Sequence, residues 1–293
     1  MKNENLNKLK PFMNRTVDKN NRQIFMTRSP TPIDDHQRIG EYNFNSCNTY
    51  MQINKYNNCD NIGVMMISLL PDGEYKYYQK LKTRYTHFLD GAVKSPYDRS
   101  VCQVGYLGEG LYSPSSNHRI YNIWKHMLTR CMDSYVLIRP SYLGVQPDPY
   151  FYSFQNFAKW YEVNFYEINN ERMDLEKDIL FKGNRIYSPN TCCFVPQSIN
   201  TVFTLNDNCR GNLPLGVIKD NDRYIAKVDI YNKQIYLGTF LTPEKAFFAY
   251  KEAKETEIKR IANDYWYNKG GMYIPQFKKV YDAMMNYQVE ITD

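Results

Sequence analysis

Residues 215–250 read LGVIKDNDRYIAKVDIYNKQIYLGTFLTPEKAFFAY, and they contain three short apolar segments followed by a helix start. Alternating apolar and polar residues between turn residues are typical of antiparallel strands. The pattern predicts strands at Val217-Ile218, from Tyr224 to Ile230, and from Ile235 to Leu237. The second turn is predicted at Asn232-Lys233. These three strands are expected to be the core of the module that spans residues 206–293.

The helix that follows is marked by its first residues. Thr242 is a good N-cap, Pro243 suits the first helical position, and Glu244 places an acid in the first turn. Glu255 and Lys259 are spaced for an ion pair four residues apart. The expected apolar face consists of Ala246, Tyr250, Ala253, Ile258, Ile261 and Ala262. We therefore expect three antiparallel strands packed against one helix that ends near residue 264.

The sequence before this module divides into three further regions, which together give an α+β fold class. Residues 1–37 form a polar arm with few apolar positions, and residues 38–112 form a small β module with a turn at Pro71-Asp72-Gly73. Residues 113–205 begin with an apolar stripe at helical spacing, followed by a second, aromatic helix. The stripe is Ile120, Ile123, Trp124, Met127, Leu128 and Cys131, and the aromatic residues are Phe154, Phe157, Trp160 and Tyr161.

The charge and aromatic content of the chain limit its possible partners but exclude few functions. The 293 residues carry a formal net charge of +6, from 37 Lys and Arg interleaved with 31 Asp and Glu. Such a balance permits weak contact with duplex DNA but does not require it. The chain has 27 Tyr and 15 Phe. Tyr suits wet protein interfaces, although an AT-rich genome would also enrich it.

Cysteine usage and hydropathy indicate a soluble protein of a reducing, intracellular compartment. None of the cysteines forms a CxxC pair or lies at zinc spacing from a histidine, so we expect reduced, mostly buried thiols and no metal site. The longest apolar run, Ile62 to Leu70, is too short to span a membrane. The cysteines are Cys47, Cys59, Cys102, Cys131, Cys192, Cys193 and Cys209.

The C-terminal module resembles the Apetala/ERF-type DNA-binding module of plant regulators and phage homing endonucleases. The matching residues are Leu215-Gly216-Val217, Tyr224-Ile225-Ala226, Leu237-Gly238-Thr239-Phe240, and Glu244 with Ala246, Ala249 and Tyr250. In that family the sheet enters the major groove, and its arginines and tryptophans read the bases. Tryptophan is absent from these strands, and acids at Asp220, Asp222 and Asp229 dilute the charge. The candidate contacts with DNA or with a partner are Lys219, Arg223, Lys227 and Lys233.

The central region resembles the HNH-like part of phage endonucleases. The residues that carry the resemblance are Tyr121, Ile123-Trp124-Lys125, Met127, Arg130-Cys131, Phe157-Ala158-Lys159-Trp160, Asp178-Ile179-Leu180, Lys182-Gly183-Asn184, Tyr187-Ser188-Pro189, Cys192-Cys193-Phe194-Val195-Pro196 and Ile199-Asn200, with Val104-Gly105-Tyr106-Leu107-Gly108 upstream. An HNH nuclease needs a histidine to activate water and further side chains to hold its metal. That base would fall near Glu176-Lys177-Asp178, where no histidine occurs. We therefore expect no catalytic residues, no cofactor and no bound metal.

Three smaller features have simpler interpretations. Asp174, Glu176 and Asp178 alternate, so a strand would place three carboxylates on one face, where they could hold a divalent metal or face solvent. The histidines His36, His87, His118 and His126 all precede the HNH-like position, and His118 and His126 flank a helix start, where they are expected as surface or capping groups. Gly105, Gly108 and Gly110 are expected in turns rather than in a phosphate-binding loop.

Taken whole, the chain resembles the phage anti-Gabija proteins. The resemblance implies a non-catalytic inhibitor that binds a host antiphage nuclease complex of the Gabija type and blocks DNA binding and cleavage. It also implies a homo-oligomer without cofactor or membrane partner, for which duplex DNA is a weak partner. Two alternatives stay open: a DNA-binding relic of a homing endonuclease, and a metal-dependent endonuclease that uses the three alternating carboxylates.

Overall fold

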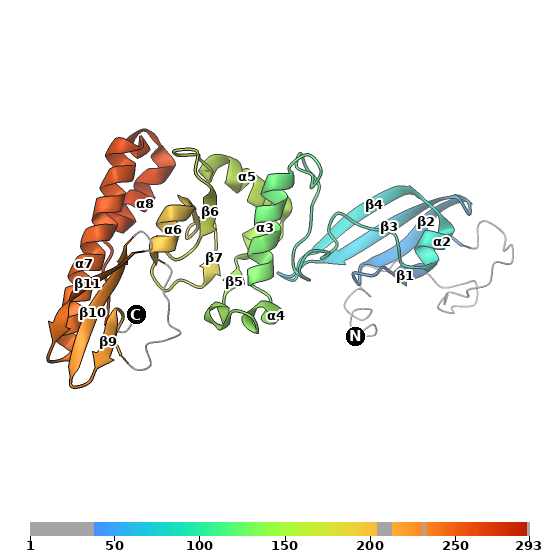
Figure 1. Ribbon diagram of the computed structural model, residues 1–293. Coiled ribbons are helices and arrows are strands. Elements are labelled where there is room, and N and C mark those ends of the chain that lie inside the picture. Colours follow the sequence, from blue (N-terminus) through green and yellow to red (C-terminus); the bar gives the residue numbers. More distant parts are fainter. Residues whose placement is uncertain (1–37, 204–212, 231–232, 292–293) are drawn as a thin grey trace. The chain divides into compact units, whose positions relative to one another are not determined.

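The computed structural model describes residues 38–203, 213–230 and 233–291 (Figure 1). The chain divides into two compact units, Met1–Lys159 and Trp160–Asp293. Both contain helices and antiparallel strands, which confirms the α+β class. The predicted region 113–205 extends across the division between Lys159 and Trp160, and the boundaries predicted near residues 112 and 205 stay predictions. The polar arm, together with His36, lies outside the described residues.

The first unit contains a four-stranded antiparallel sheet in the order β1-β2-β3-β4. The strands are β1 (Tyr42–Phe44), β2 (Tyr50–Asn58), β3 (Asn61–Leu69) and β4 (Tyr75–Thr83). The predicted turn after β3 is confirmed, because the Gly73 N–H donates to the Leu70 carbonyl at 3.0 Å. The β module also includes a short helix, α2 (Tyr85–Leu89), which the alternating pattern did not predict.

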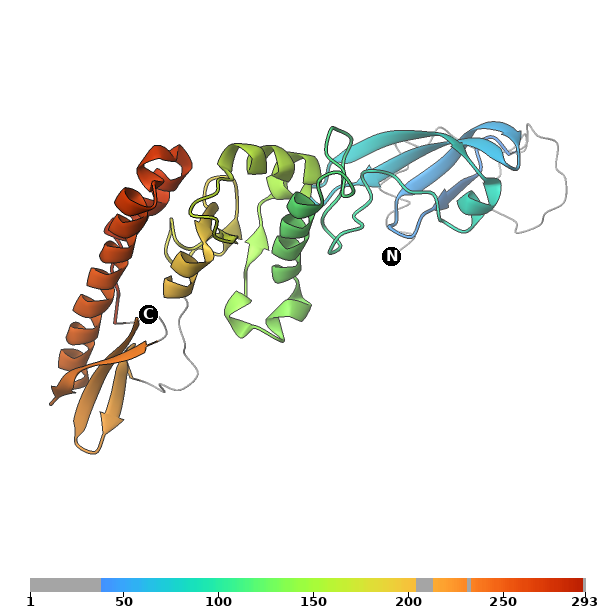
Figure 2. The same ribbon diagram turned by 45° about the horizontal axis from the view of Figure 1, so that its top comes forward.

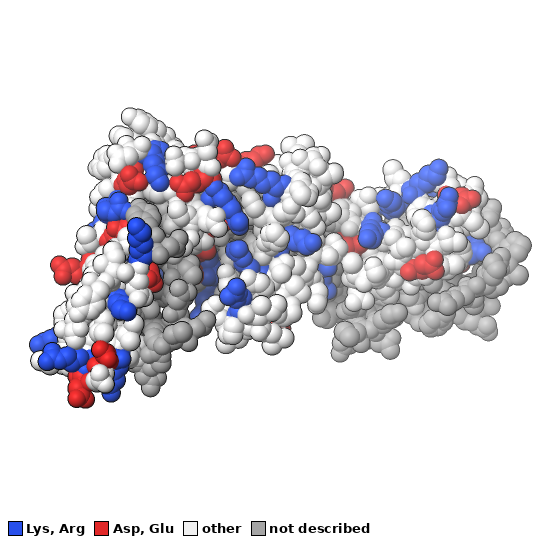
Figure 3. Space-filling model, viewed as in Figure 1, with Lys and Arg blue, Asp and Glu red and all other residues white. Residues whose placement is uncertain are grey.

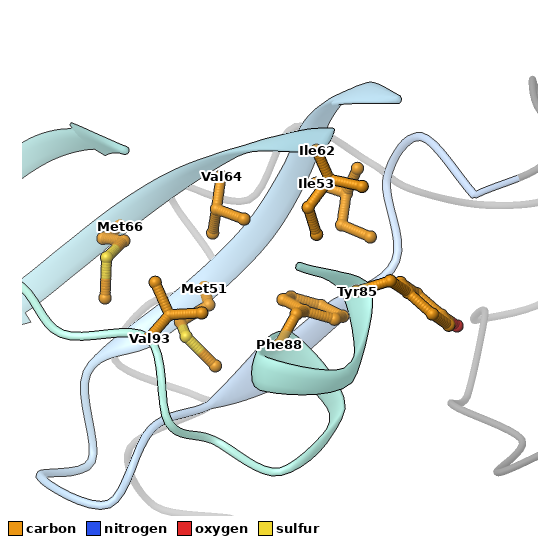
Figure 4. Close-up of a cluster of buried hydrophobic side chains, with 8 residues drawn as sticks. All are labelled: Met51, Ile53, Ile62, Val64, Met66, Tyr85, Phe88 and Val93. Atoms are coloured by element: carbon orange, nitrogen blue, oxygen red, sulfur yellow. The ribbon is translucent and has the colours of Figure 1, made fainter. Parts of the chain in front are cut away.

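Both faces of this sheet are apolar. One face packs against α2, and Figure 4 shows Phe88 lying among the side chains of β2 and β3. The residues of that first cluster are Met51, Ile53, Ile62, Val64, Met66, Tyr85, Phe88 and Val93. The other face has a second cluster around Tyr50 and Ile67, which are 0% and 1% exposed. Its partly buried members are Tyr42, Phe44, Met65 and Tyr75.

A buried carboxylate ties the turn between β1 and β2 to the segment after α2. Asp98 is 3% exposed, and its oxygens accept hydrogen bonds from Asn45 Nδ2 at 2.8 and 2.9 Å, Thr49 Oγ1 at 2.6 Å and the Ser95 N–H at 2.9 Å. A buried charge is tolerated when several donors satisfy it. These bonds therefore fix residues 95–98 against residues 45–49.

Helices fill the rest of the first unit. They are α3 (His118–Arg130), α4 (Asp133–Val136), η3 (Pro140–Tyr142), η4 (Pro149–Tyr152) and the start of α5 (Phe154–Asn164), with a short strand β5 (Gln146–Pro147) between them. The predicted stripe of α3 is confirmed, because Ile120, Trp124, Met127 and Leu128 are buried. The Trp124 indole donates to the Phe151 carbonyl at 2.7 Å. A Cβ on Gly105 would lie 2.5 Å from Leu128 Cδ1, so the absence of a side chain permits this packing.

The second unit begins with a small strand pair and a helix. Strands β6 (Met173–Glu176) and β8 (Cys193–Pro196) are antiparallel, with Met173 opposite Pro196 and Glu176 opposite Cys193. A short strand, β7 (Ile186–Tyr187), lies between them in the chain, and α6 (Gln197–Phe203) follows directly. Phe194 is fully buried, with aromatic ring centroids 5.2–5.4 Å away. Those rings belong to Trp160, Tyr161 and Phe165.

The C-terminal module matches its prediction. Strands β9 (Val217–Asp220), β10 (Arg223–Ile230) and β11 (Lys233–Phe240) form an antiparallel sheet in the order β11-β10-β9, with α7 (Pro243–Asn263) packed along it (Figures 1 and 2). Thr242 caps α7 by accepting from the Lys245 N–H. A π-helical turn η5 (Asp264–Asn268), a short η6 (Gly271–Tyr273) and α8 (Pro275–Met285) complete the unit.

Three details differ from the predictions. Glu255 pairs with Lys251 at 3.0 Å rather than with Lys259, because both Lys251 and Glu255 bond the backbone of Val289. Lys233 belongs to β11 rather than to the turn, while Asn232 lies outside the described residues. The described cysteines are all free, but only Cys192 and Cys193 are buried, and Cys209 lies outside the described residues.

Within residues 38–203, 213–230 and 233–291, no helix combines the length and apolar character that crossing a bilayer requires.

Candidate functional site

The sheet of the C-terminal module has one face against α7 and one face directed away from it. Along β10, Tyr224, Ala226, Val228 and Ile230 pack into the cluster formed with α7. Successive side chains of a strand point to opposite faces. The residues between them, among them Ile225, therefore lie on the face away from the helix.

Strand pairing identifies the neighbours on that face. Ile225 lies opposite Ile218 of β9 and Thr239 of β11, and Lys227 lies opposite Tyr236. The Tyr236 hydroxyl and Thr239 Oγ1 are 2.8 Å apart, so one donates to the other. We define the open face as the surface made by Ile218, Asp220, Arg223, Ile225, Lys227, Asp229, Gln234, Tyr236 and Thr239.

The open face combines cations, carboxylates and exposed apolar groups. Ile218 is 45% exposed and Tyr236 is 59% exposed. Arg223 lies opposite Asp220 at the hairpin end, where Asn221 adopts a φ of 53°. An exposed aromatic ring beside Arg and Lys is a common composition for a contact surface. The face can therefore contact phosphates or carboxylates together with apolar groups.

The four predicted contact residues do not form one patch. Arg223 and Lys227 lie on the open face, four residues apart on β10. Lys219 is the cross-strand partner of Tyr224, and Lys233 is that of Ile230, so both lie on the side of α7. The two pairs point to opposite sides because the side-chain period of a strand is two. Figure 3 shows acidic side chains beside basic ones near the hairpin ends of this module.

Lys177 lies in the segment where the resemblance to HNH nucleases predicts the base. Lys177 follows directly after β6 and is 7% exposed. Its Nζ donates to both oxygens of Asp178, at 2.5 and 2.7 Å, and lies 5.7 Å from the ring centroid of Tyr187. An ammonium that donates to a carboxylate has no lone pair with which to accept a proton from water.

The three alternating carboxylates are held by separate partners. Asp174 accepts from Arg172 Nε at 3.1 Å and from Asn200 Nδ2 at 3.3 Å. Glu176 accepts from the Lys177 N–H at 3.2 Å, and Asp178 lies beyond the end of β6. Among the described residues, no three His, Cys, Asp or Glu side chains converge on a metal position.

The described histidines belong to the first unit. His87 and His126 are exposed, on α2 and α3. His118 is the first residue of α3, and its Nδ1 lies 3.2 Å from Asn122 Nδ2. His118 and His126 are thus both exposed, as expected, but only His118 lies at the helix start.

A polar cluster that the sequence did not indicate lies beside α6. Glu171 accepts from Ser198 Oγ at 2.6 Å, from the Tyr265 hydroxyl at 2.5 Å and from Asn169 Nδ2 at 3.2 Å. Lys269 Nζ lies 3.4 Å from Glu171 and 3.7 Å from the Tyr265 ring centroid. Burial raises the pKa of the Glu171 carboxyl, but these hydrogen bonds and the ammonium outweigh it and lower the pKa overall.

This Glu171 cluster connects residues 94 to 98 positions apart, and no local motif signals it. Its groups already satisfy one another, so it joins the turn after α7 to α6 and to the loop before β6. The open face is therefore the candidate site of the second unit. Comparisons of the chain with protein-family models, curated proteins and solved structures find no match to any of them.

Proposed function

We propose that this chain is a non-catalytic inhibitor that binds a host antiphage nuclease complex of the Gabija type in the bacterial cytoplasm and blocks its DNA binding and cleavage. The observation that carries the proposal is the buried Lys177. Its ammonium donates to both carboxylate oxygens of Asp178, in the segment where the resemblance to HNH nucleases predicts the base. This pair supports a role in binding, because the site holds a cation where a base would be needed.

The surface of the chain is also consistent with a binding role. Solvent-exposed aromatic and aliphatic side chains beside cations favour protein interfaces over plain solvated surface. The open face offers Tyr236 and Ile218 in this way. Self-association is part of the proposal, since a homo-oligomer presents each contact surface more than once to a large partner.

The direct test is reconstitution with the host complex. The purified chain is added to a Gabija-type nuclease complex, and cleavage of a DNA substrate is followed together with co-elution on a sizing column. We expect a stable complex and a dose-dependent loss of cleavage. Full nuclease activity at saturating chain, with no co-elution, would reject the proposal. Co-expression with the defence system should correspondingly restore plaque formation by a sensitive phage.

A separate assay addresses catalysis by the chain itself. Plasmid DNA is incubated with the purified chain in magnesium or manganese, and no nicking is expected. Nicking that the Asp178→Ala variant abolishes would instead support the metal-dependent endonuclease.

Duplex DNA binding is the second candidate, and the placement of Arg223 and Lys227 on the open face favours it. Each phosphate contact contributes about one unit to the salt dependence of affinity. The Arg223→Ala/Lys227→Ala double variant should therefore weaken duplex binding and reduce the salt slope by about two units. The matched control is Lys219→Ala/Lys233→Ala, which removes the same charge on the side of α7. Equal effects of the two double variants would count against DNA binding through the open face.

A further inference from the structure

Strand β11 is an exposed sheet edge with little charge. It is the outer strand of the order β11-β10-β9, and within the described residues no strand pairs with its outer side. Of its eight residues, KQIYLGTF, only Lys233 is charged, and it is the first. Ile235 is 42% exposed on the side of α7, and Tyr236 is 59% exposed on the open face. An uncharged edge of this length is a template for pairing with another strand.

The other long edge of the molecule shows the contrast. Strand β4 is the outer strand of the sheet in the first unit, and its sequence YKYYQKLKT contains Lys76, Lys80 and Lys82. Lysines on an edge strand oppose pairing with another chain, because a paired strand would bury or crowd their charges. The edge strand β4 thus carries lysines that oppose pairing with another chain, whereas the edge strand β11 lacks them beyond its first residue.

We infer that β11 pairs antiparallel with β11 of a second copy of this chain. Antiparallel pairing about a two-fold axis is self-complementary, so a single strand sequence satisfies both sides. A register centred on Ile235 pairs Ile235 with its own copy and Gln234 with Tyr236, and it leaves no two lysines opposite each other. A strand with like charges at its centre would not permit this arrangement.

The irregularity in β11 limits the paired run but does not prevent it. The register with β10 shifts between Ala226 and Lys227, so Leu237 is the extra residue and packs into the core with α7. The regular run is Lys233–Tyr236, opposite Lys227–Ile230. A bulge bends the edge locally, so we place the contact in this first half of β11.

Pairing would join two three-stranded sheets into one of six strands. The open faces of both copies would then be continuous, and each would contribute Arg223 and Lys227 to a single surface. The inference rests on the homo-oligomer part of the proposed function and names its surface. It is tested without the nuclease complex, so its failure would leave the inhibition proposal standing.

The experiment compares single lysine substitutions on the two edges of the same sheet. Molar mass is measured by sedimentation equilibrium for the full chain, for Ile235→Lys on β11, and for Ile218→Lys on β9. Ile218 is similarly exposed, so its substitution makes the same chemical change away from β11. We expect a self-associating parent, an Ile235→Lys variant whose dissociation constant rises at least about tenfold, and an Ile218→Lys variant like the parent.

Amide hydrogen exchange gives a second readout that does not depend on hydrodynamic behaviour. Amides in residues 233–237 of the parent should exchange more slowly at high than at low chain concentration, while those of β9 should not change. In Ile235→Lys, preserved protection in β10 and α7 shows that the module is folded. A monomeric parent at all concentrations, or equal dissociation by both lysine variants, would overturn the inference. Protection of β11 only when the host complex is added would assign the edge to that partner instead.

Discussion

The two larger sheets of this protein are both antiparallel, but they differ in how many of their faces are buried. In β2 the consecutive residues Tyr50, Met51, Gln52 and Ile53 are all buried, so both faces of the first sheet lie within apolar clusters. In β10 buried and accessible positions alternate, and only the side of α7 is packed. A sheet buried on both faces stabilises a unit, whereas a sheet with one accessible face can also bind.

The edges of the sheets follow the same division. The first sheet ends in a lysine-containing β4, while the C-terminal sheet ends in the nearly uncharged β11. Function in this molecule is therefore expected on the C-terminal sheet, and stability of the first unit is expected to depend on residues inside its sheet. Matched substitutions in the two sheets test that division.

The largest effect is expected for a lysine placed inside the first sheet. Ile67 is 1% exposed beside Tyr50, so Ile67→Lys would bury an ammonium without a partner. We expect a loss of about 4 kcal/mol in the free energy of unfolding of that unit. The matched Ile218→Lys change on the open face should cost less than about 0.5 kcal/mol. Denaturant unfolding followed by hydrogen exchange of each unit measures both, and similar costs would remove the distinction between the sheets.

A smaller loss is expected from removing the buried carboxylate at Asp98. Asp98→Ala removes the buried acceptor that Asn45, Thr49 and the Ser95 N–H share, which should destabilise the first unit by about 3 kcal/mol. Asp90→Ala is the control, since Asp90 is an exposed acid of the same unit. Thermal unfolding compares the variants. If the two alanine variants unfold at the same temperature, the hydrogen bonds of Asp98 do not stabilise the packing of residues 95–98 against residues 45–49.

Local signals made the C-terminal module predictable. Thr242 and Pro243 mark a helix start through capping and a fixed φ, and the strands of the module show alternation between turn residues. These effects act within a few residues, so the sequence contains them. The same holds for the stripe of α3, where Trp124 and Leu128 recur at helical spacing.

Features that depend on distant residues were not predictable. The face of the sheet on which Lys219 lies follows from its pairing with Tyr224 on the next strand. The choice of Lys251 as the ion-pair partner of Glu255 follows from the position of Val289, whose N–H donates to Glu255. The bond between Tyr265 and Glu171 joins residues 94 positions apart. Tertiary contacts of this kind are set by packing, and neither spacing nor propensity reports them.

The smallest expected effect is a pH dependence of opposite sign in the two units. Burial raises the pKa of the Glu41 carboxyl, and the hydrogen bond from the Tyr85 hydroxyl at 2.7 Å and the charge of Arg38 do not offset it. A carboxyl with a raised pKa in the fold binds more protons than in the unfolded chain. Its contribution to stability is therefore greatest at low pH and declines as pH rises above its ordinary value of 4.5.

Glu171 should behave in the opposite way, because its pKa in the fold is lowered from 4.5. Its stabilising contribution is fully present above 4.5 and is lost as pH falls through the lowered value. The test is the difference in unfolding free energy between the parent and each of Glu41→Gln and Glu171→Gln, measured from pH 3 to pH 7 by urea titration with exchange resolved by unit. We expect differences under about 1 kcal/mol that fall with rising pH for Glu41 and rise with it for Glu171. Parallel trends would mean that one of the two carboxyls lies in a different environment, because burial outweighs the donors at Glu41, whereas the donors and the ammonium outweigh burial at Glu171.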